Sequence, residues 1–66
     1  MERVDIAKNI TTLVKSCGKS QLQIAVELDI DESTVRNYMT GKALPSVLVV
    51  IKLRKVLNCS YEDILG

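Results

Sequence analysis

The sequence predicts an all-α domain of five helices, and three observations lead to that expectation. Apolar residues recur at the spacing of amphipathic helices along most of the chain. Serine, aspartate, glycine and asparagine stand where these periodic segments begin and end, as helix caps do. Nearly half of the 66 residues are hydrophobic but only two are aromatic, which indicates an aliphatic core. A chain of this length forms one small domain, so residues 1–66 are expected to fold together.

The first two helices are marked by periodicity and by a capping pair. The first is expected over residues 4–16. Its apolar positions, at i, i+4, i+7, i+8 and i+11, are Ile6, Ile10, Leu13, Val14 and Cys17. Gly18 ends this helix. Ser20 is a good N-cap for the second helix, over residues 21–28, and Gln23 completes a capping box with it.

A third helix is expected over residues 32–40, separated from the second by a tight turn. Asp31 is the predicted cap, with Glu32 in the first turn, where the helix dipole favours an acid. Gly41 supplies the C-terminal stop. The apolar face of the second helix is Ile24, Ala25 and Leu28, and that of the third is Val35, Tyr38 and Met39.

Pro45 and Ser46 start the fourth helix, which runs to about Leu57, where Asn58 fits the left-handed position that follows a helix. Residues 47–51 are β-branched enough to favour a strand, but the helix signals on both sides decide for a helix. Its predicted core face is Val47, Val50, Leu53 and Leu57. Ser60 and Asp63 then cap a last helix over residues 61–65.

Composition excludes several classes of function. The net charge is +1, which is low for a nucleic-acid-binding domain. There is no histidine, and Cys17 and Cys59 stand far apart without neighbouring metal ligands, so neither a metal, a cofactor nor an enzyme active site is expected. Lone thiols and the lack of a signal peptide predict a cytoplasmic protein. The longest apolar run is far too short to span a membrane.

The pattern S-Q-x-x-I-A-x-x-L-x-I-D-x-S-T-V-x-x-Y-x-x-G-K-x-x-P-S, which begins at Ser20, resembles the helix-turn-helix of the phage repressor and Cro class of small bacterial regulators. The resemblance continues to Leu65. It implies a compact five-helix repressor-like DNA-binding domain, with the motif formed by the second and third helices. It also implies sequence-specific binding of duplex DNA by a homodimeric transcriptional regulator, a repressor, whose third helix enters the major groove.

The resemblance implies the DNA-contacting residues by position. Those expected to face bases are Glu32, Ser33, Arg36 and Asn37, whose side chains can read cytosine, several bases, guanine and adenine in turn. Those expected to contact phosphates are Lys19, Gln21, Thr34, Thr40 and Lys42. Two alternatives stay open for Glu32, which can pair with Arg36 along the helix or repel phosphate together with Asp29 and Asp31.

Four positions depart from the family pattern, two of them as a linked pair. Asp29 stands where the turn usually has glycine, and aspartate tolerates the left-handed conformation. Val14 and Met39 stand where many members carry an arginine and a glutamate in a partly buried ion pair, so these two side chains are predicted to touch. Arg54 replaces an inward alanine, which requires either an aliphatic stem along the surface or a rotated helix.

The fourth helix has more apolar residues than one core face can use. Family habit, which places dimerisation near the C-terminal end, suggests a dimer interface among Leu48, Val49, Ile51, Val56 and Leu65. The alternative to a dimer interface is that these residues fill the small core, with the remaining apolar side chains scattered over the surface. The alternative to DNA binding is a protein-interaction module, in which the helix-turn-helix serves only as a scaffold that binds another protein. The near-neutral net charge favours this alternative.

Overall fold

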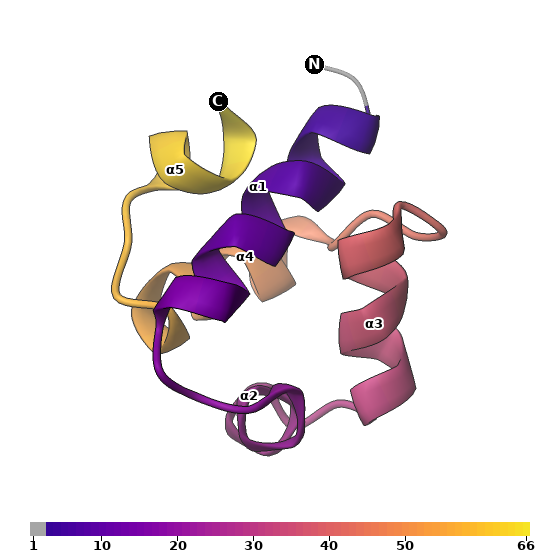
Figure 1. Ribbon diagram of the computed structural model, residues 1–66, viewed down its shortest axis with the longest axis vertical. Coiled ribbons are helices and arrows are strands. Elements are labelled where there is room, and N and C mark those ends of the chain that lie inside the picture. Colours follow the sequence, from indigo (N-terminus) through magenta and orange to yellow (C-terminus); the bar gives the residue numbers. More distant parts are fainter. Residues whose placement is uncertain (1–2) are drawn as a thin grey trace.

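The computed structural model of the protein describes residues 3–66 and contains five helices in that range (Figure 1). They are α1 (Arg3–Ser16), α2 (Gln21–Leu28), α3 (Glu32–Thr40), α4 (Val47–Val56) and α5 (Tyr61–Leu65). No strand occurs among these residues, so the predicted all-α class is confirmed. Each helix begins and ends within two residues of the predicted bounds, and α4 begins at Val47 rather than at Pro45, because Ser46 is its N-cap.

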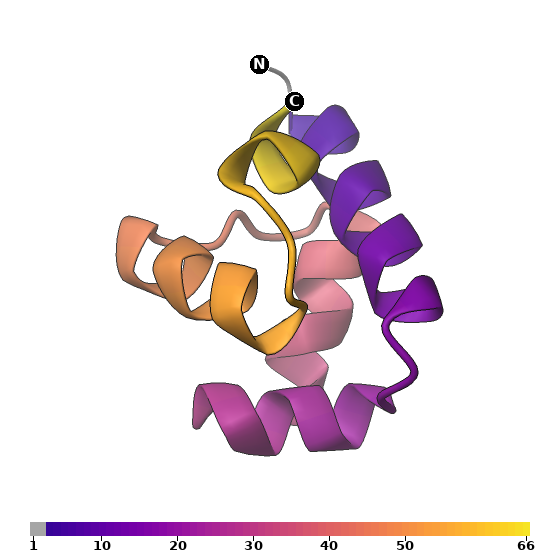
Figure 2. The same cartoon turned by 90° about the vertical axis from the view of Figure 1, so that its left-hand side faces the viewer.

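The five helices close around a single core. α2 lies at one end of the molecule and α5 at the opposite end (Figures 1 and 2). α1 packs against α3 and α5, α2 packs against α3 and α4, and α4 also contacts α5. The outward side of α3 is not covered by any other helix in Figure 1. The fold therefore presents α3 to solvent while α1 and α2 support it from behind.

The core is aliphatic apart from Tyr38, and every helix contributes at least one buried aliphatic side chain. The largest fully buried side chains are Ile10, Ile24, Leu28, Val35, Leu53 and Ile64. Ala25 is buried as well, which confirms the apolar face predicted for α2. In the part of the chain whose burial is defined, no polar or charged residue is buried, so the core needs no internal ion pair.

The positions where the family resemblance implies an ion pair face this core. Val14 is buried, and Met39 is partly buried against the same cluster of side chains. One turn before Val14 on α1, the Thr11 hydroxyl donates a hydrogen bond to the Met39 carbonyl oxygen at 3.0 Å. This bond holds the end of α3 against the part of α1 where the Val14–Met39 contact is predicted.

Serine side chains begin α2 and α5 in different ways. The Ser20 Oγ accepts a hydrogen bond from the Gln23 N–H at 3.1 Å. The return bond of the predicted capping box, from the Ser20 N–H to the Gln23 side chain, is missing among the described residues. At α5 the box is complete: Ser60 Oγ accepts from the Asp63 N–H at 3.1 Å, and Asp63 Oδ2 accepts from the Ser60 N–H at 3.0 Å. The charged acceptor makes the second bond stronger.

The prediction that the Asp31 side chain caps α3 is wrong in one respect. Asp31 occupies the N-cap position with an extended backbone, but its carboxylate makes no capping hydrogen bond. Its carbonyl oxygen accepts from the Thr34 and Val35 N–H groups at 3.0 and 3.4 Å. The exposed carboxylate stays in water, so it stabilises α3 only through its attraction to the positive end of the helix dipole.

Left-handed residues make the two turns that flank α3. Asp29 has φ 58° and ψ 45°, as the replacement of glycine at this position predicts. Its N–H donates to Val26 O while the Ile30 N–H donates to Ala25 O, which forms a Schellman motif at the end of α2. Gly41 has φ 82° and ends α3. Glycine is favoured there by the positive φ and not by lack of space, since an added Cβ would meet only Ala7 Cβ at an ordinary 3.6 Å.

The two cysteines are free thiols, each partly buried against the core, as the sequence predicts. Burial raises the pKa of the Cys59 thiol above its usual value; the Asp63 carboxylate adds to this rise, and the Arg54 guanidinium opposes it. The raised pKa favours the protonated thiol of Cys59 at neutral pH. Within residues 3–66 no three metal-binding side chains cluster together, and no helix there has the length and apolarity to cross a bilayer.

Candidate nucleic-acid interface

The outer face of α3 carries the residues that the sequence predicts to face DNA bases. Glu32, Ser33 and Arg36 are exposed, and Asn37 is half-buried. These positions share one side of the helix because residues three or four apart lie above one another. The opposite side is held in the core by Val35 and Tyr38. The packing of α3 therefore fixes which side chains point outward.

The polar groups on this face are free to bind a ligand. The Arg36 guanidinium has neither a hydrogen bond nor an ion pair with any other described residue, so the possible pair with Glu32 does not form. The Asn37 carbonyl oxygen accepts from the Ala43 N–H and the Thr40 hydroxyl, both at 3.3 Å, while its side-chain amide has no partner in residues 3–66. Arg36 and Asn37 thus offer unused donors, and Asn37 also an acceptor.

The start of α2 is open to an anion. The first N–H groups of a helix have no acceptor within the helix. Ser20 takes the N–H of Gln23, which leaves those of Gln21 and Leu22. Gln21 is half-buried, and its N–H group lies at the positive end of the helix dipole. This geometry suits a phosphate oxygen.

The remaining residues predicted to contact phosphate differ in their accessibility. Lys42 is fully exposed just after α3, and its ammonium group has no ion pair among the described residues. Thr40 is exposed, but its hydroxyl donates to the Asn37 carbonyl oxygen. Thr34 is half-buried near the first turn of α3. Of these three, Lys42 is the side chain with the most freedom to reach a neighbouring phosphate.

The sequence predicts that Lys19 contacts a phosphate, which requires a free ammonium group, but in the structure this group already has partners. Its Nζ forms an ion pair with Glu27 Oε1 at 2.9 Å and donates a hydrogen bond to the Val56 carbonyl oxygen at 3.0 Å. Sequence reasoning missed this arrangement because Val56 is 37 residues away along the chain. The structure thus commits the Lys19 ammonium to intramolecular partners.

The charge around this interface is predominantly acidic. Residues 20–42 contain four acidic side chains and two basic ones. The acids are Glu27, Asp29, Asp31 and Glu32, all exposed, and the bases are Arg36 and Lys42. Repulsion between these acids and phosphates lowers the affinity that a single copy of this domain can reach. The acids gather at the start of α3, whereas Arg36 and Lys42 lie towards its end.

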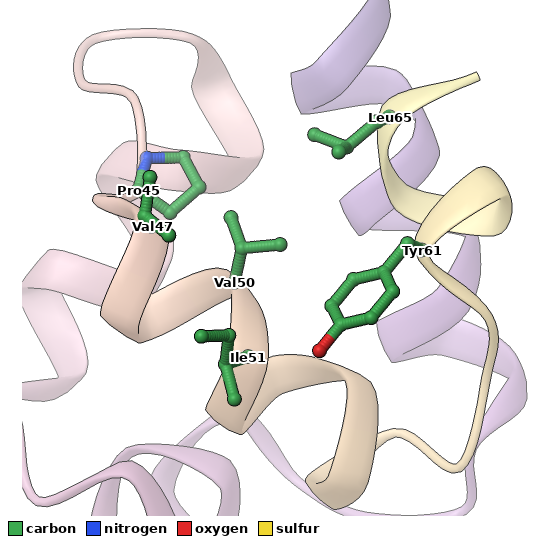
Figure 3. A pocket seen from close by; sticks show the side chains of 6 residues that line it. All are labelled: Pro45, Val47, Val50, Ile51, Tyr61 and Leu65. Atoms are coloured by element: carbon green, nitrogen blue, oxygen red, sulfur yellow. The ribbon is translucent and has the colours of Figure 1, made fainter.

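A second surface feature is an apolar groove between α4 and α5. Its volume is about 420 Å³, and its lining residues are Pro45, Val47, Val50, Ile51, Tyr61 and Leu65. Figure 3 shows Tyr61 and Leu65 on α5 facing Val50 and Ile51 on α4. None of the residues predicted to contact DNA lines the groove. The groove is thus a separate apolar surface of the domain.

The surplus apolar residues of α4 divide between the groove and the core. Val47, predicted to be a core residue, is 77% exposed. That prediction is wrong because the first turn of α4 extends past its neighbours, and Val47 lines the open groove instead. Leu48 is 71% exposed, and Ile51 and Leu65 are partly accessible at the surface. Val49 and Val56, predicted at a dimer interface, pack partly buried against the core of their own chain.

Arg54 resolves its departure from the family pattern by lying on an aromatic ring. Its guanidinium carbon is 5.2 Å from the centre of the Tyr61 ring, within the range of a cation–π contact. The Arg54 Nε is buried without a hydrogen-bond partner in the described chain. The aliphatic stem therefore runs along the protein, and the head covers one face of a ring that also lines the groove. The sequence did not identify Tyr61 as the partner of Arg54 or as a residue of the groove.

Comparisons with known proteins agree with this architecture. A helix-turn-helix family model matches residues 10–64. The fold is similar to that in the crystal structure of the restriction-modification controller protein C.AhdI from Aeromonas hydrophila, with a TM-score of 0.85 and 22% sequence identity over 94% of this chain and 90% of that one. No curated protein sequence matches the chain. With α2 and α3 forming the motif, this chain belongs to the helix-turn-helix family of DNA-binding transcriptional regulators, in the phage repressor and Cro class.

Proposed function

We propose that the protein represses transcription as a homodimer on duplex DNA, with α3 of each copy in a major groove. The observation that carries this proposal is the outer face of α3, where the Arg36 and Asn37 side chains have unused hydrogen-bonding groups. The promoter is that of its own gene or of a neighbouring one in a bacterium or mobile element, within the cytoplasm. The protein acts by binding alone, with no catalysis and no cofactor.

The side chains on α3 suit direct reading of base edges. A guanidinium such as that of Arg36 can donate two hydrogen bonds to one guanine, and an amide such as that of Asn37 can pair with adenine. Ser33 is small and tolerant, so it contributes less discrimination. Glu32 can accept from cytosine, but it also stands among the exposed acids. Specificity therefore rests chiefly on Arg36 and Asn37.

A second copy is the occupant that best fits the groove between α4 and α5. The groove is apolar, and the exposed side chains at its edge, Val47 and Leu48, can bury against a partner. The flanking charges favour self-association: α4 carries Lys52, Arg54 and Lys55 without an acid, and α5 carries Glu62 and Asp63 without a base. A two-fold pairing can set the basic helix of each copy beside the acidic helix of the other.

Selection of bound sequences from a random duplex pool at low salt tests this function. The expected result is a two-fold-symmetric site whose half-sites are centred about 34 Å apart, one turn of duplex. Absence of any enriched sequence would instead support a protein-interaction module. In that case the exposed acids Asp29, Asp31 and Glu32, together with the apolar groove, would be the contact surface for a protein partner.

Lys42→Ala is expected to weaken binding to all duplexes by a similar factor. Lys42 is exposed and unpaired, so it can contribute a phosphate contact that carries no sequence information. Removal of one phosphate contact from each copy should reduce the slope of log K against log salt concentration by about 1.8. Fluorescence titrations of cognate and unrelated duplexes over a range of salt measure this. An unchanged slope would remove Lys42 from the interface.

Val47→Asp is expected to shift the protein towards monomer. Val47 is 77% exposed on the groove, and aspartate in the first turn of α4 is favoured by the helix dipole, so the fold should tolerate the change. Val26→Asp is the matched control, since Val26 is 69% exposed on α2 and does not line the groove. Sedimentation of both variants and the parent at high micromolar concentration, with and without DNA, gives the answer. A parent that is monomeric under all these conditions contradicts the dimer.

A further inference from the structure

Lys19 joins three parts of the fold that are distant in sequence. It lies in the connection between α1 and α2, directly before Ser20, the N-cap of α2. Its Nζ is 2.9 Å from the Glu27 carboxylate on α2 and 3.0 Å from the Val56 carbonyl oxygen on α4. The side chain is only partly accessible to solvent. One cation thus connects the start of α2, the body of α2 and the end of α4.

The contact with Val56 completes the hydrogen bonding at the end of α4. The last four carbonyl oxygens of a helix lack the next turn of N–H donors and need other partners. Three of these four accept backbone N–H groups from residues 57–59, at distances between 2.8 and 3.3 Å. In the described chain, the carbonyl oxygen of Val56 receives its hydrogen bond from Lys19. A positive charge at this end also complements the helix dipole.

We propose that Lys19 is a positioning residue that fixes the DNA-contacting helices relative to the dimer-forming helix α4. The inference rests on the proposed function, because α2 and α3 contact DNA there while α4 borders the groove that a second copy fills. The exposed Lys19–Glu27 pair alone would contribute little. The bond to the end of α4 adds an anchor across the α2–α4 contact, which also contains buried apolar side chains. Lys19 therefore helps to set the separation of the two α3 helices in the dimer.

A spacing series of duplexes tests this role. The selected site is prepared with its half-sites moved together or apart by one base pair, about 3.4 Å. The parent and Lys19→Arg, which keeps a cation able to reach both partners, are expected to bind the optimal spacing about tenfold more tightly than either shifted site. Lys19→Met should lose most of this preference, and it should bind the optimal site more weakly, because α2 and α3 are no longer anchored to α4 through this residue.

The matched control is Lys42→Met, which removes an equivalent charge at the exposed end of α3. This control should keep the spacing preference and reduce the salt slope by about 1.8. Lys19→Met should keep the salt slope of the parent. If Lys19→Met instead reduces the salt slope by this amount and keeps the spacing preference, Lys19 is a phosphate contact and the inference is wrong.

Unfolding of the protein without DNA separates this inference from the proposed function. Lys19→Met, Glu27→Gln and the double variant form a cycle whose urea unfolding midpoints report the coupling of the two side chains. The expected result is a smaller drop in midpoint for the double variant than the two single drops added together. A drop for Lys19→Met that persists in the Glu27→Gln background supports the anchor, because it then arises from the bond to Val56; no drop for Lys19→Met overturns it. Failure to find any DNA site for the parent would overturn the proposed function while leaving this cycle intact.

Discussion

Val14→Arg is expected to destabilise the domain by about 3–5 kcal/mol, because it places a charge without a partner in the core. Val14 is 5% exposed, and the side chains around it are aliphatic. Urea unfolding followed by circular dichroism measures the change in the free energy of unfolding. Thr12→Arg is the matched control: Thr12 is exposed on the same helix, so the same added charge should change the stability by no more than about 0.5 kcal/mol.

The double variant Val14→Arg with Met39→Glu is expected to recover part of that loss. Met39 is partly buried on α3, and its carbonyl oxygen is bound by Thr11, which lies one turn from Val14. The glutamate therefore enters where the arginine can reach it, and a paired charge costs less than an unpaired one. If the two single losses simply add, the side chains at positions 14 and 39 do not meet, and the equivalence of these positions with the family's ion pair fails.

Arg36→Ala is expected to cost about 1–3 kcal/mol of binding free energy on the cognate duplex and to relax the preference at one base position per half-site. The Arg36 side chain is exposed and unpaired, so its loss should leave the fold unchanged. Titration against the selected duplex and against each single-base variant of it measures both effects. Unaltered affinity and unaltered base preference would show that the outer face of α3 does not read DNA.

Glu32→Gln is the companion variant that separates the two roles left open for this acid. If Glu32 only repels phosphate, removal of its charge should tighten binding to every duplex. If it accepts a hydrogen bond from cytosine, the change should weaken the cognate duplex selectively. Both outcomes are compatible with Arg36 reading a base, since the structure shows no ion pair between these two side chains. Comparison of cognate and unrelated duplexes in the same titrations distinguishes the roles.

Because the α2–α3 unit is acidic, the proposed dimer matters for the affinity of the protein for DNA. Four exposed acids lie in this unit against two bases, so a single copy meets substantial repulsion from the duplex. In the proposed dimer, two copies joined through the groove would bind two half-sites at once, so the second contact would be intramolecular. Variants that weaken self-association should therefore also weaken DNA binding. The prediction for Val47→Asp and the selection of a two-fold site are linked through this argument.

The sequence by itself determined the features that depend on a few neighbouring residues. The capping box of Ser60 and Asp63 and the left-handed conformations of Asp29, Gly41 and Asn58 all occur where the sequence predicts them. The sequence also predicted the bounds of the helices to within two residues, and it predicted the family to which the chain belongs. These features are readable because a cap or a turn satisfies hydrogen bonds within about one helical turn of itself. The exceptions are the carboxylate of Asp31 and the side chain of Gln23, which do not make the capping hydrogen bonds that the sequence predicts.

Only the tertiary structure decided which surplus side chains face solvent. Spacing places Val47 and Val50 on one side of α4, yet Val50 is buried and Val47 lies at the surface, because the neighbouring helices cover only part of that side. Val49 and Val56, which spacing does not place on the core face of α4, nevertheless pack partly buried against the core. Lys19 meets Val56 from 37 residues away. Such contacts follow from the angles between packed helices, which the local periodicity of a sequence does not specify.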